Sequence, residues 1–299
     1  MTRFPPFEKL SAIIRLARNE DLGSGDLTSR LLVADDVQAT AIIQQKQAGV
    51  ICGLPIVPMV CRVYDRRLRV KELPGRPVAS IEGQWHGPGL TPLLAISGPM
   101  RSLLAAERVI LNFLQHLSGV ATLTRQFVEA VRGTAARIYD TRKTLPGLRL
   151  LEKYAVATGG GHNHRMGLFD AVLVKNNHLK RAASGKLAEF VAGIVAGARR
   201  HGRRCVVEVE VATLEQLRQV LTVSGVDIVL LDNMTCAQMR RAVAMRNESR
   251  APVELEASGG ITLRNVRAVA LTGVDRISVG SLTHSAPALD INMSITPAA

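Results

Sequence analysis

Six short apolar segments in the second half of the chain, each followed by a helix-like segment, constrain the fold most. Their starts are 22 to 34 residues apart, and they lie at 137–140, 171–175, 205–210, 227–231, 253–257 and 276–279. Strands that alternate with helices at this spacing are typical of βα units and a parallel sheet. Six such units in succession favour an α/β barrel or a relative of it.

The first part of the chain has a different pattern, which indicates an α+β domain. Residues 6–19 place Leu10, Ile13 and Ile14 on one helical face. The other expected elements are strands at 39–45, 68–73 and 93–97, a helix at 53–64, and a long helical stretch from 100 to 131. We expect an interruption of that long stretch at Ser118-Gly119, because glycine weakens a helix interior.

Polar or glycine residues follow every one of the six apolar segments. In chain order they are Asp140 to Thr144, Lys175 to His178, Glu208 with Glu210, Asp232-Asn233, Ser258 to Gly260, and Gly280-Ser281. In α/β barrels the active site lies at the carboxyl ends of the strands. The sequence therefore predicts an active site at this edge of the sheet.

A phosphate site is predicted at the last two of these strand ends. Ser258, Gly259 and Gly260 precede a helix-like segment, 261–270, whose first backbone N–H groups could hold a phosphate. Gly280-Ser281 would form a second wall, as the last two loops do in many barrels. The alternative is an ordinary tight turn.

Basic residues dominate the segment from 140 to 180. Arg142, Lys143, Arg165 and Lys175 lie at or near strand ends, and a run of three glycines, 159–161, precedes His162 and His164. Arginine binds carboxylates in bidentate fashion, so we expect a ligand with several negative charges. We assign three other basic residues of the segment to a solvated face: Arg149, Lys153 and Lys180.

Two further interpretations of these residues concern catalysis and metal. Lys175 ends an apolar strand, and a buried lysine can form a Schiff base, although a carboxylate-binding role is favoured. The histidines lack a third zinc ligand at standard spacing, so hydrogen bonding or packing is expected of them. Glu210 and Asp232 suit magnesium or sugar hydroxyls. Glu208 shares a strand face with Glu210, but Glu210 is preferred because it is closer to the strand end.

The net charge of +13 narrows the classes of partner. A basic excess suits nucleic acid, a membrane surface or anionic small molecules. One Trp, three Tyr and six Phe are few for base stacking, and no apolar stretch is long enough to span a membrane. The N-terminus lacks an apolar signal region, so we expect a cytoplasmic protein with reduced cysteines.

Several motifs together resemble the quinolinate phosphoribosyltransferase family. They are EDLGSGDLTS (20–29), AERVILNFLQHLSGVAT (106–122), DTRKTLPGLRLLEKYAVATGGGHNHRMGL (140–168), LVKNNH (173–178), VEVEV (207–211), LLDN (230–233), EASGGITLRNV (256–266) and TGVDRISVGSLTHS (272–285). The match runs through nearly the whole chain in the right order.

The resemblance implies a reaction and a fold. Quinolinate and phosphoribosyl pyrophosphate (PRPP) would give nicotinate mononucleotide, pyrophosphate and carbon dioxide in de novo NAD synthesis, with Mg²⁺. The implied fold is an N-terminal α/β open-faced sandwich (1–115, joined by the tail 285–299) plus an incomplete, seven-stranded α/β barrel (116–284). The family forms homodimers or larger assemblies. Alternatives are a related transferase for another heterocycle, a Schiff-base aldolase, or a nucleic-acid binder.

The resemblance also implies roles for individual residues. The quinolinate carboxylates would be bound by Arg142, His164, Arg165 and Lys175, with Arg108 reaching in from the partner subunit. Lys143 would lie near the reacting groups and the pyrophosphate, and Glu210 and Asp232 near the ribose and the metal. The catalytic set is then Lys143, Lys175, Glu210 and Asp232. The phosphate cradle would be Ser258, Gly259, Gly260, Gly280, Ser281 and His284.

Three positions depart from the family pattern. Asn176 stands where the family usually has Asp, and Ala212 stands where an acidic or amide residue is common. The segment 180–187 is slightly longer than usual. The first two changes alter the expected charge beside Lys175 and Glu210.

Overall fold

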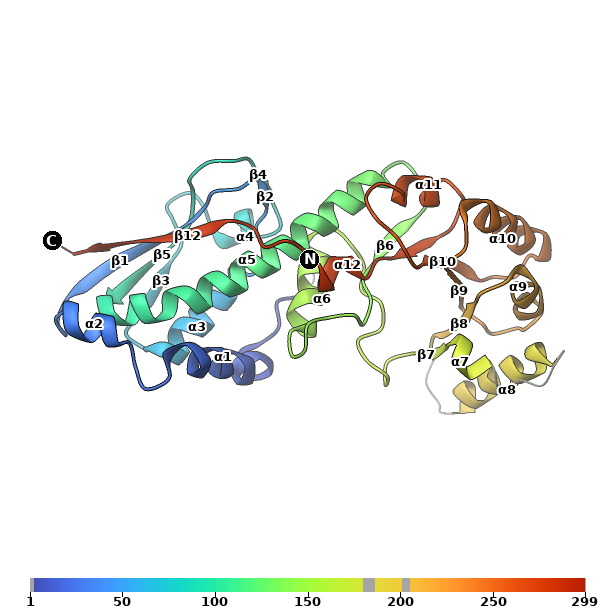
Figure 1. The fold of residues 1–299 in the computed structure, drawn as a ribbon, viewed down its shortest axis with the longest axis horizontal. Helices are drawn as coiled ribbons and strands as arrows, with labels where there is room; N and C mark the ends of the chain where they lie inside the picture. The colour runs from blue at the N-terminus through green and yellow to red at the C-terminus, as the bar shows by residue number, and fades with distance from the viewer. Residues whose placement is uncertain (1–2, 180–185, 201–204, 299) are drawn as a thin grey trace. The chain divides into compact units, whose positions relative to one another are not determined.

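The computed structural model describes residues 3–179, 186–200 and 205–298 (Figure 1). The chain divides into two compact units. Unit 1 comprises Met1–Arg125, Thr144–Gly160 and Leu282–Ala299, and unit 2 comprises Gln126–Lys143 and Gly161–Ser281. The domain boundaries expected at 115/116 and 284/285 stay a prediction. Lys180 and most of the longer segment at 180–187 lie outside the described residues.

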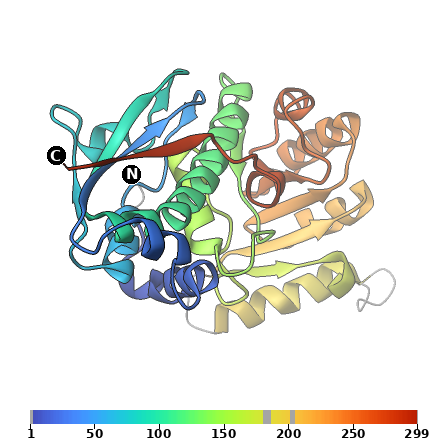
Figure 2. The same cartoon turned by 60° about the vertical axis from the view of Figure 1, so that its left-hand side comes forward.

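Unit 1 contains a four-stranded antiparallel sheet in the order β12-β1-β5-β3. These strands are β1 (Gln38–Gln45), β3 (Arg69–Lys71), β5 (Thr91–Pro99) and β12 (Ile291–Pro297). The C-terminal strand β12 pairs with β1, so the tail joins the N-terminal sheet as expected (Figure 2). Alternate residues of β1 are buried, including Ala39, Ala41 and Ile43, while Gln38 and Thr40 are exposed. This alternation is typical of a sheet covered on one face.

The remaining elements of unit 1 are mostly helices. They are α1 (Phe7–Leu22), α2 (Leu27–Leu32), α3 (Ile56–Tyr64), α4 (Val78–Ile81) and α6 (Arg149–Thr158), together with a short pair of strands, β2 (Gly49–Val50) and β4 (Trp85–His86). Helix α1 buries Leu10 and Ile14, two of the residues expected on its apolar face.

Helix α5 (Met100–Ala130) is continuous, so the interruption expected at Ser118-Gly119 was wrong. A Cβ atom on Gly119 would lie 2.1 Å from the backbone oxygen of Pro287. The Ser118 hydroxyl accepts a hydrogen bond from the backbone N–H of Cys52, at 3.0 Å. The small residues at 118–119 therefore admit neighbouring backbone rather than end the helix.

Unit 2 contains a parallel sheet in the order β6-β11-β10-β9-β8-β7. Its strands are β6 (Arg137–Tyr139), β7 (Val172–Val174), β8 (Val207–Val211), β9 (Ile228–Asp232), β10 (Glu254–Ser258) and β11 (Arg276–Ser278). All six predicted strands are confirmed. The seventh strand implied by the resemblance is not among the described strands of this sheet.

Helices alternate with these strands along the chain. They are α7 (Asn176–Leu179), α8 (Leu187–Arg200), α9 (Leu214–Leu221), α10 (Cys236–Ser249) and α11 (Val266–Ala270), and α12 (Ser281–His284) follows β11, with all but its first residue in unit 1. In Figure 1, α8, α9 and α10 lie along the outer side of the sheet. Helices α9 and α10 each begin with a capping box, at Thr213 and Thr235. None of the described helices is long and apolar enough to cross a membrane.

The two faces of the parallel sheet differ in chemistry. Val207, Val209 and Leu255, with their equivalents on neighbouring strands, are fully buried and form the apolar core. Side chains alternate along a strand, so Glu208 and Glu256 lie on the opposite face, where they are also buried. Burying carboxylates is costly unless they have partners, so this polar face requires an explanation.

Candidate active site

The carboxyl ends of the parallel strands bring the predicted residues of unit 2 to one edge of the sheet. Ser258 pairs in register with Asp232 on one side and with Ser278 on the other. Glu210 pairs with Leu230, one strand further along. The ends of four neighbouring strands therefore form one continuous polar row.

A buried carboxylate joins two separate segments of the site. Asp140 follows β6 and is fully buried, and its Oδ1 accepts the backbone N–H of His164 at 2.7 Å. The backbone N–H of Asp140 donates to the backbone oxygen of His162 at 3.0 Å. These bonds place His164 and Arg165 beside the strand end that leads to Arg142.

Two guanidinium groups are held near each other at this strand end. Arg165 is half-buried, and its Nη1 donates to the backbone oxygen of Ala171 at 3.1 Å. Burial and the positive charge of Arg142 both lower the pKa of Arg165. Like charges held together in this way favour an anion as their common partner. Lys143 is exposed in the same loop.

Lys175, at the end of an apolar strand, is exposed. Its backbone N–H donates to Nδ1 of His178 at 3.0 Å. A Schiff-base lysine is activated by desolvation, and this environment does not supply it. The aldolase alternative therefore loses its physical basis, whereas an exposed lysine can still bind a carboxylate.

Glu210 and Asp232 are half-exposed at neighbouring strand ends. Oε1 of Glu210 accepts the backbone N–H of Asn176 at 3.2 Å, and Oδ1 of Asp232 accepts from the side-chain amide of Asn233 at 2.9 Å. The contact to Glu210 uses the backbone of Asn176, so it does not depend on the departure from Asp. Carboxylate oxygens suit Mg²⁺, which commonly takes one or two of them and completes its shell with phosphate and water.

The predicted phosphate cradle is a loop rather than a helix start. Helix α11 begins only at Val266, so the helix expected directly after Gly260 was wrong. Asn265 organises the turn instead: its Oδ1 accepts the N–H of Thr262 at 2.8 Å and its Nδ2 donates to the oxygen of Gly260 at 2.9 Å. Gly259 has φ +97°, and a Cβ there would lie 2.1 Å from Oδ1 of Asn233.

The remaining predicted residues are placed as follows. Gly280 and Ser281 follow β11, with Ser281 starting α12. Arg108 is exposed on α5, and His284 is exposed at the end of α12, with Nδ1 2.6 Å from the Ser285 hydroxyl. Both of these residues belong to unit 1, and their roles in the site stay predictions.

A buried charged layer below the strand ends was missed from the sequence. Nε2 of His164 lies 3.0 Å from Oε2 of Glu208 and 3.5 Å from Oε1 of Glu256. Nε of Arg276 lies 2.6 Å from the other oxygen of Glu256, and its guanidinium carbon lies 3.7 Å from the ring centre of Tyr139. The sequence did contain a signal for this layer. Glu254, Glu256 and Arg276 are charged residues on one face of short strands that were interpreted as apolar.

The charges in this layer shift one another's pKa values. Burial, together with the negative charge of Glu208, raises the pKa of Glu256. Burial by itself lowers the pKa of His164, but the hydrogen bond and charge of Glu208 and the charge of Glu256 raise it overall. The layer therefore favours a proton on Nε2 of His164, the nitrogen that faces the two carboxylates.

One expectation about basic residues was also wrong. Lys153, assigned to a solvated face, is 1% exposed on α6. Arg149 is half-buried, and its Nε donates to the Thr144 hydroxyl at 2.9 Å. A lysine in a helix carries no local sequence signal that distinguishes these environments.

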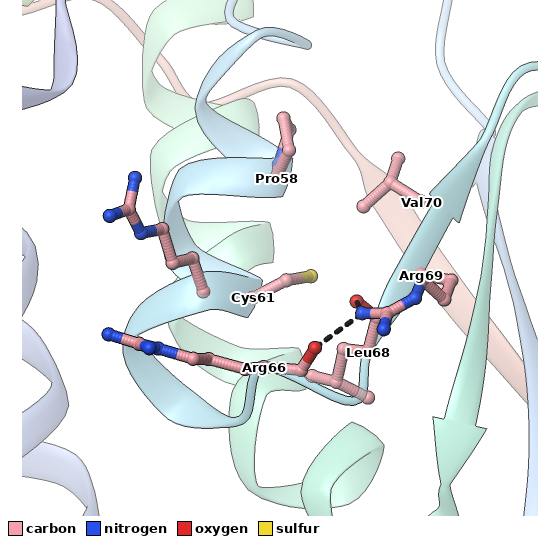
Figure 3. A pocket seen from close by; sticks show the side chains of 7 residues that line it. Pro58, Cys61, Arg66, Leu68, Arg69 and Val70 are labelled. Atoms are coloured by element: carbon pink, nitrogen blue, oxygen red, sulfur yellow. Dashed lines mark hydrogen bonds between the residues drawn. The ribbon is translucent and has the colours of Figure 1, made fainter.

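A basic hollow of about 400 Å³ lies on α3 and β3 in unit 1 (Figure 3). Arg69 donates to the backbone oxygen of Arg66, and the guanidinium of Arg62 lies 4.9 Å from the ring centre of Phe7. In Figure 3 the side chain of Arg66 points away from Cys61. The described contacts of Arg62 and Arg69 are thus with different partners, the ring of Phe7 and the backbone of Arg66.

Unit 2 has acidic and basic side chains at the carboxyl ends of its parallel strands. This arrangement is typical of α/β-barrel enzymes, and it places the chain in that class. Residues 120–294 match the C-terminal domain of quinolinate phosphoribosyl transferase, and residues 26–118 match its N-terminal domain. The chain belongs to the quinolinate phosphoribosyltransferase family.

Individual relatives agree with this membership. The chain is 42% identical over 291 residues to the nicotinate-nucleotide pyrophosphorylase [carboxylating] of Mycobacterium leprae, covering 97% of this chain and 98% of that one. It is 39% identical to the probable enzyme of Bacillus subtilis, covering 93% and 90%. The structure of the Francisella tularensis nicotinate-nucleotide pyrophosphorylase matches with a TM-score of 0.85 at 36% identity, covering 98% of each chain.

Proposed function

We propose that this chain transfers the phosphoribosyl group of PRPP to quinolinate with decarboxylation. The products are nicotinate mononucleotide, pyrophosphate and carbon dioxide, in the de novo synthesis of NAD. The observation that carries this proposal is the match of both family domains, together covering residues 26–118 and 120–294, with relatives that are named for this activity. The enzyme is a pentosyltransferase, a nicotinate-nucleotide diphosphorylase (carboxylating).

Quinolinate is assigned to the basic end of the strand row. Arg142 and Arg165 would bind its two carboxylates, and their mutual proximity supports an anion there. His164 and Lys175 complete the set, with Arg108 of the partner subunit. In a homodimer or larger assembly this last residue would make the site a shared one.

PRPP is assigned to the loops after β9, β10 and β11. The backbone of Ser258, Gly259 and Gly260, with Gly280, Ser281 and His284, would hold the 5′-phosphate. Gly259 has a positive φ, and a Cβ atom there would overlap the side chain of Asn233, so only glycine fits this position. This requirement supports a loop of fixed shape. Glu210 and Asp232 would face the ribose, and Lys143 the pyrophosphate.

Magnesium is the proposed metal, held by Glu210 and Asp232 together with PRPP oxygens and water. When bound, it would neutralise the charge that gathers on the departing pyrophosphate. The two carboxylates would also stabilise the positive charge that grows on the ribose as the C1′–O bond breaks. The quinolinate nitrogen then attacks C1′, and Arg142 and Arg165 keep the ring in line.

Decarboxylation follows from the charge on the pyridine ring. Bond formation at nitrogen makes the ring cationic, so the electron pair left at C2 by departing carbon dioxide is stabilised. The carbanion then takes up a proton. A site closed to water would favour this loss of charge. We also propose that the enzyme acts in the cytoplasm.

The decisive test is the release of carbon dioxide from carboxyl-labelled quinolinate by the purified protein, with and without PRPP. Release is expected only with PRPP and Mg²⁺, with nicotinate mononucleotide formed in equal amount. Parallel reactions with nicotinate and nicotinamide address the related transferases. Turnover of either one in preference to quinolinate would contradict the proposal.

A further inference from the structure

The buried layer under the strand ends contains two carboxylates, and their negative charge must be balanced. Glu208 is 1% exposed and Glu256 is fully buried, so each carboxylate requires a positive or hydrogen-bonding partner. Arg276 supplies one for Glu256, through the 2.6 Å contact to Oε2. His164 supplies one for Glu208, through the 3.0 Å contact from Nε2. Oε1 of Glu208 and of Glu256 have no hydrogen-bond partner among the described residues.

A divalent cation is a poor candidate for this layer, although oxygen or nitrogen atoms of His164, Glu208 and Glu256 lie within 4.8 Å of one another. Arg276 already contributes one positive charge to the buried group that contains the carboxylates of Glu208 and Glu256. A dication would leave the buried group with a net positive charge, whereas one proton would leave it neutral. Because uncompensated buried charge is costly, the layer suits a proton better than a metal.

The histidine in this layer is connected to the substrate side of the site. Its backbone N–H donates to Oδ1 of Asp140, and its Nδ1 accepts the backbone N–H of Arg165 at 2.8 Å, so the ring proton lies on Nε2. Arg165 is the next residue and one of the two guanidinium groups assigned to quinolinate. Any rotation of the His164 ring would therefore disturb the loop that carries Arg165.

We infer that Glu208 and Glu256 are positioning residues for quinolinate recognition, acting through His164. Glu208 accepts the Nε2–H at 3.0 Å, and a carboxylate oxygen of Glu256 lies 3.5 Å from the same nitrogen. Together they fix the ring plane from inside the sheet and direct the Nδ1 edge toward Arg165. This inference rests on the proposed function for its substrate. It assigns no contact with quinolinate to either carboxylate.

The test compares Glu208→Gln and Glu208→Ala with Glu254→Gln, measuring kcat and KM for each substrate across pH. Gln keeps an oxygen for the Nε2–H but removes the charge, and Ala removes both. Glu254 is a matched control, because it lies on β10 and contacts Arg276 at 3.3 Å but has no contact with His164 among the described pairs.

For Glu208→Gln we expect the KM for quinolinate to rise roughly tenfold, because the hydrogen bond to Nε2–H loses its charge, with the KM for PRPP and kcat little changed. Glu208→Ala should have the larger KM, and Glu254→Gln should resemble wild type. Equal losses for both substrates at every pH, or a Glu208→Gln profile that matches Glu254→Gln, would overturn the inference.

A measurement on the wild-type protein covers the case in which the variants do not fold. Nitrogen-15 NMR of the histidine rings, assigned with His164→Gln, reports which ring nitrogen carries a proton. We expect Nε2 to be protonated, and a ring with bare Nε2, or one whose signal shifts when Zn²⁺ is added, would contradict the inference. Absence of carbon dioxide release by wild type would instead count against the proposed function, and the NMR result would be independent of it.

Discussion

At the scale of single residues, the two ends of the strand row differ in charge. Arg142 and Arg165 form the basic end, whereas Glu210 and Asp232 form the acidic part. Quinolinate and PRPP are both anions, so charge by itself does not separate them. What separates them is geometry, because planar guanidinium groups suit carboxylates and carboxylates suit ribose hydroxyls and Mg²⁺.

Arg165→Ala should weaken quinolinate binding and leave PRPP binding nearly unchanged. The loss of a charged, bidentate partner is worth about 1.5–3 kcal/mol, which is roughly a tenfold to hundredfold rise in Kd. Calorimetric titration with quinolinate would measure it. Arg199→Ala is the control, since Arg199 is an exposed arginine of α8 whose described contacts are with Asp227 and Gly225. Normal quinolinate binding by Arg165→Ala would remove this residue from the site.

Glu210→Ala and Asp232→Ala should have the opposite effect. We expect the KM for PRPP to rise at least roughly tenfold and the Mg²⁺ requirement to increase, because carboxylate oxygens near the ribose and metal are lost. Quinolinate affinity, measured by calorimetry, should stay near wild type. Glu215→Ala, on the exposed surface of α9, is the control. If quinolinate affinity collapsed while PRPP use stayed normal, the two ends of the site would have been assigned the wrong way round.

At the scale of elements, glycines show how much local sequence leaves undecided. Gly119 lies inside α5 and faces the backbone of the C-terminal tail. Gly193 lies inside α8, and a Cβ atom added to it would have no neighbouring atom within 4 Å. Both glycines look alike in the sequence, as weak points of a helix. Only the tertiary structure shows that Gly119 is required, because it leaves room for the backbone of the C-terminal tail.

Gly119→Ala and Gly193→Ala should therefore change stability in opposite directions. The new methyl at 119 would overlap the oxygen of Pro287 and cost about 1–3 kcal/mol, despite the better helix propensity of alanine. The methyl at 193 should stabilise by up to about 1 kcal/mol. Thermal unfolding of both variants beside wild type would measure this. A rise in Tm for Gly119→Ala would show that the tail does not pack against α5 in this way.

The sequence predicts elements well where periodicity is strong and poorly where packing decides. All six strands of the parallel sheet were predicted, because β-branched runs at regular spacing identify them. The helix expected after Gly260 was wrong, because the side chain of Asn265 stabilises a turn there. Burial of Glu256 and of Lys153 was missed, because a charged residue is expected to be exposed unless its partner, distant in sequence, is known.

At the scale of the whole molecule, the net charge of +13 affects how fast anionic substrates associate with the protein rather than how the chain folds. A positive field raises the local concentration of anionic substrates and their rates of association, and salt screens it. The same charge suits nucleic acid, but the proposed function favours small anions as the partners of this charge. The proposed assembly of the chain is a second property at this scale, and Arg108 is the residue through which it would bear on the site.

The action of Arg108 in the partner's site can be tested by mixing two inactive variants. Arg108→Ala and Lys175→Ala should each be nearly inactive by themselves. If Arg108 and Lys175 of the same site come from different subunits, as proposed, one site of a mixed dimer carries both lesions and the other carries neither. Random pairing makes half of the dimers mixed, each with one intact site of two, so roughly a quarter of wild-type activity should return on co-expression.

The control for this experiment is a pair of lesions in the same subunit's contribution. Lys175→Ala co-expressed with Arg165→Ala should recover nothing beyond the residual activity of each variant, because both residues serve the same subunit's site and every site keeps one lesion. Differently tagged subunits allow the mixed dimers to be purified before assay. If those dimers from the Arg108→Ala and Lys175→Ala pair are as inactive as the parents, Arg108 does not act in the partner's site. The exposed position of Arg108 on α5 would then be that of a surface arginine.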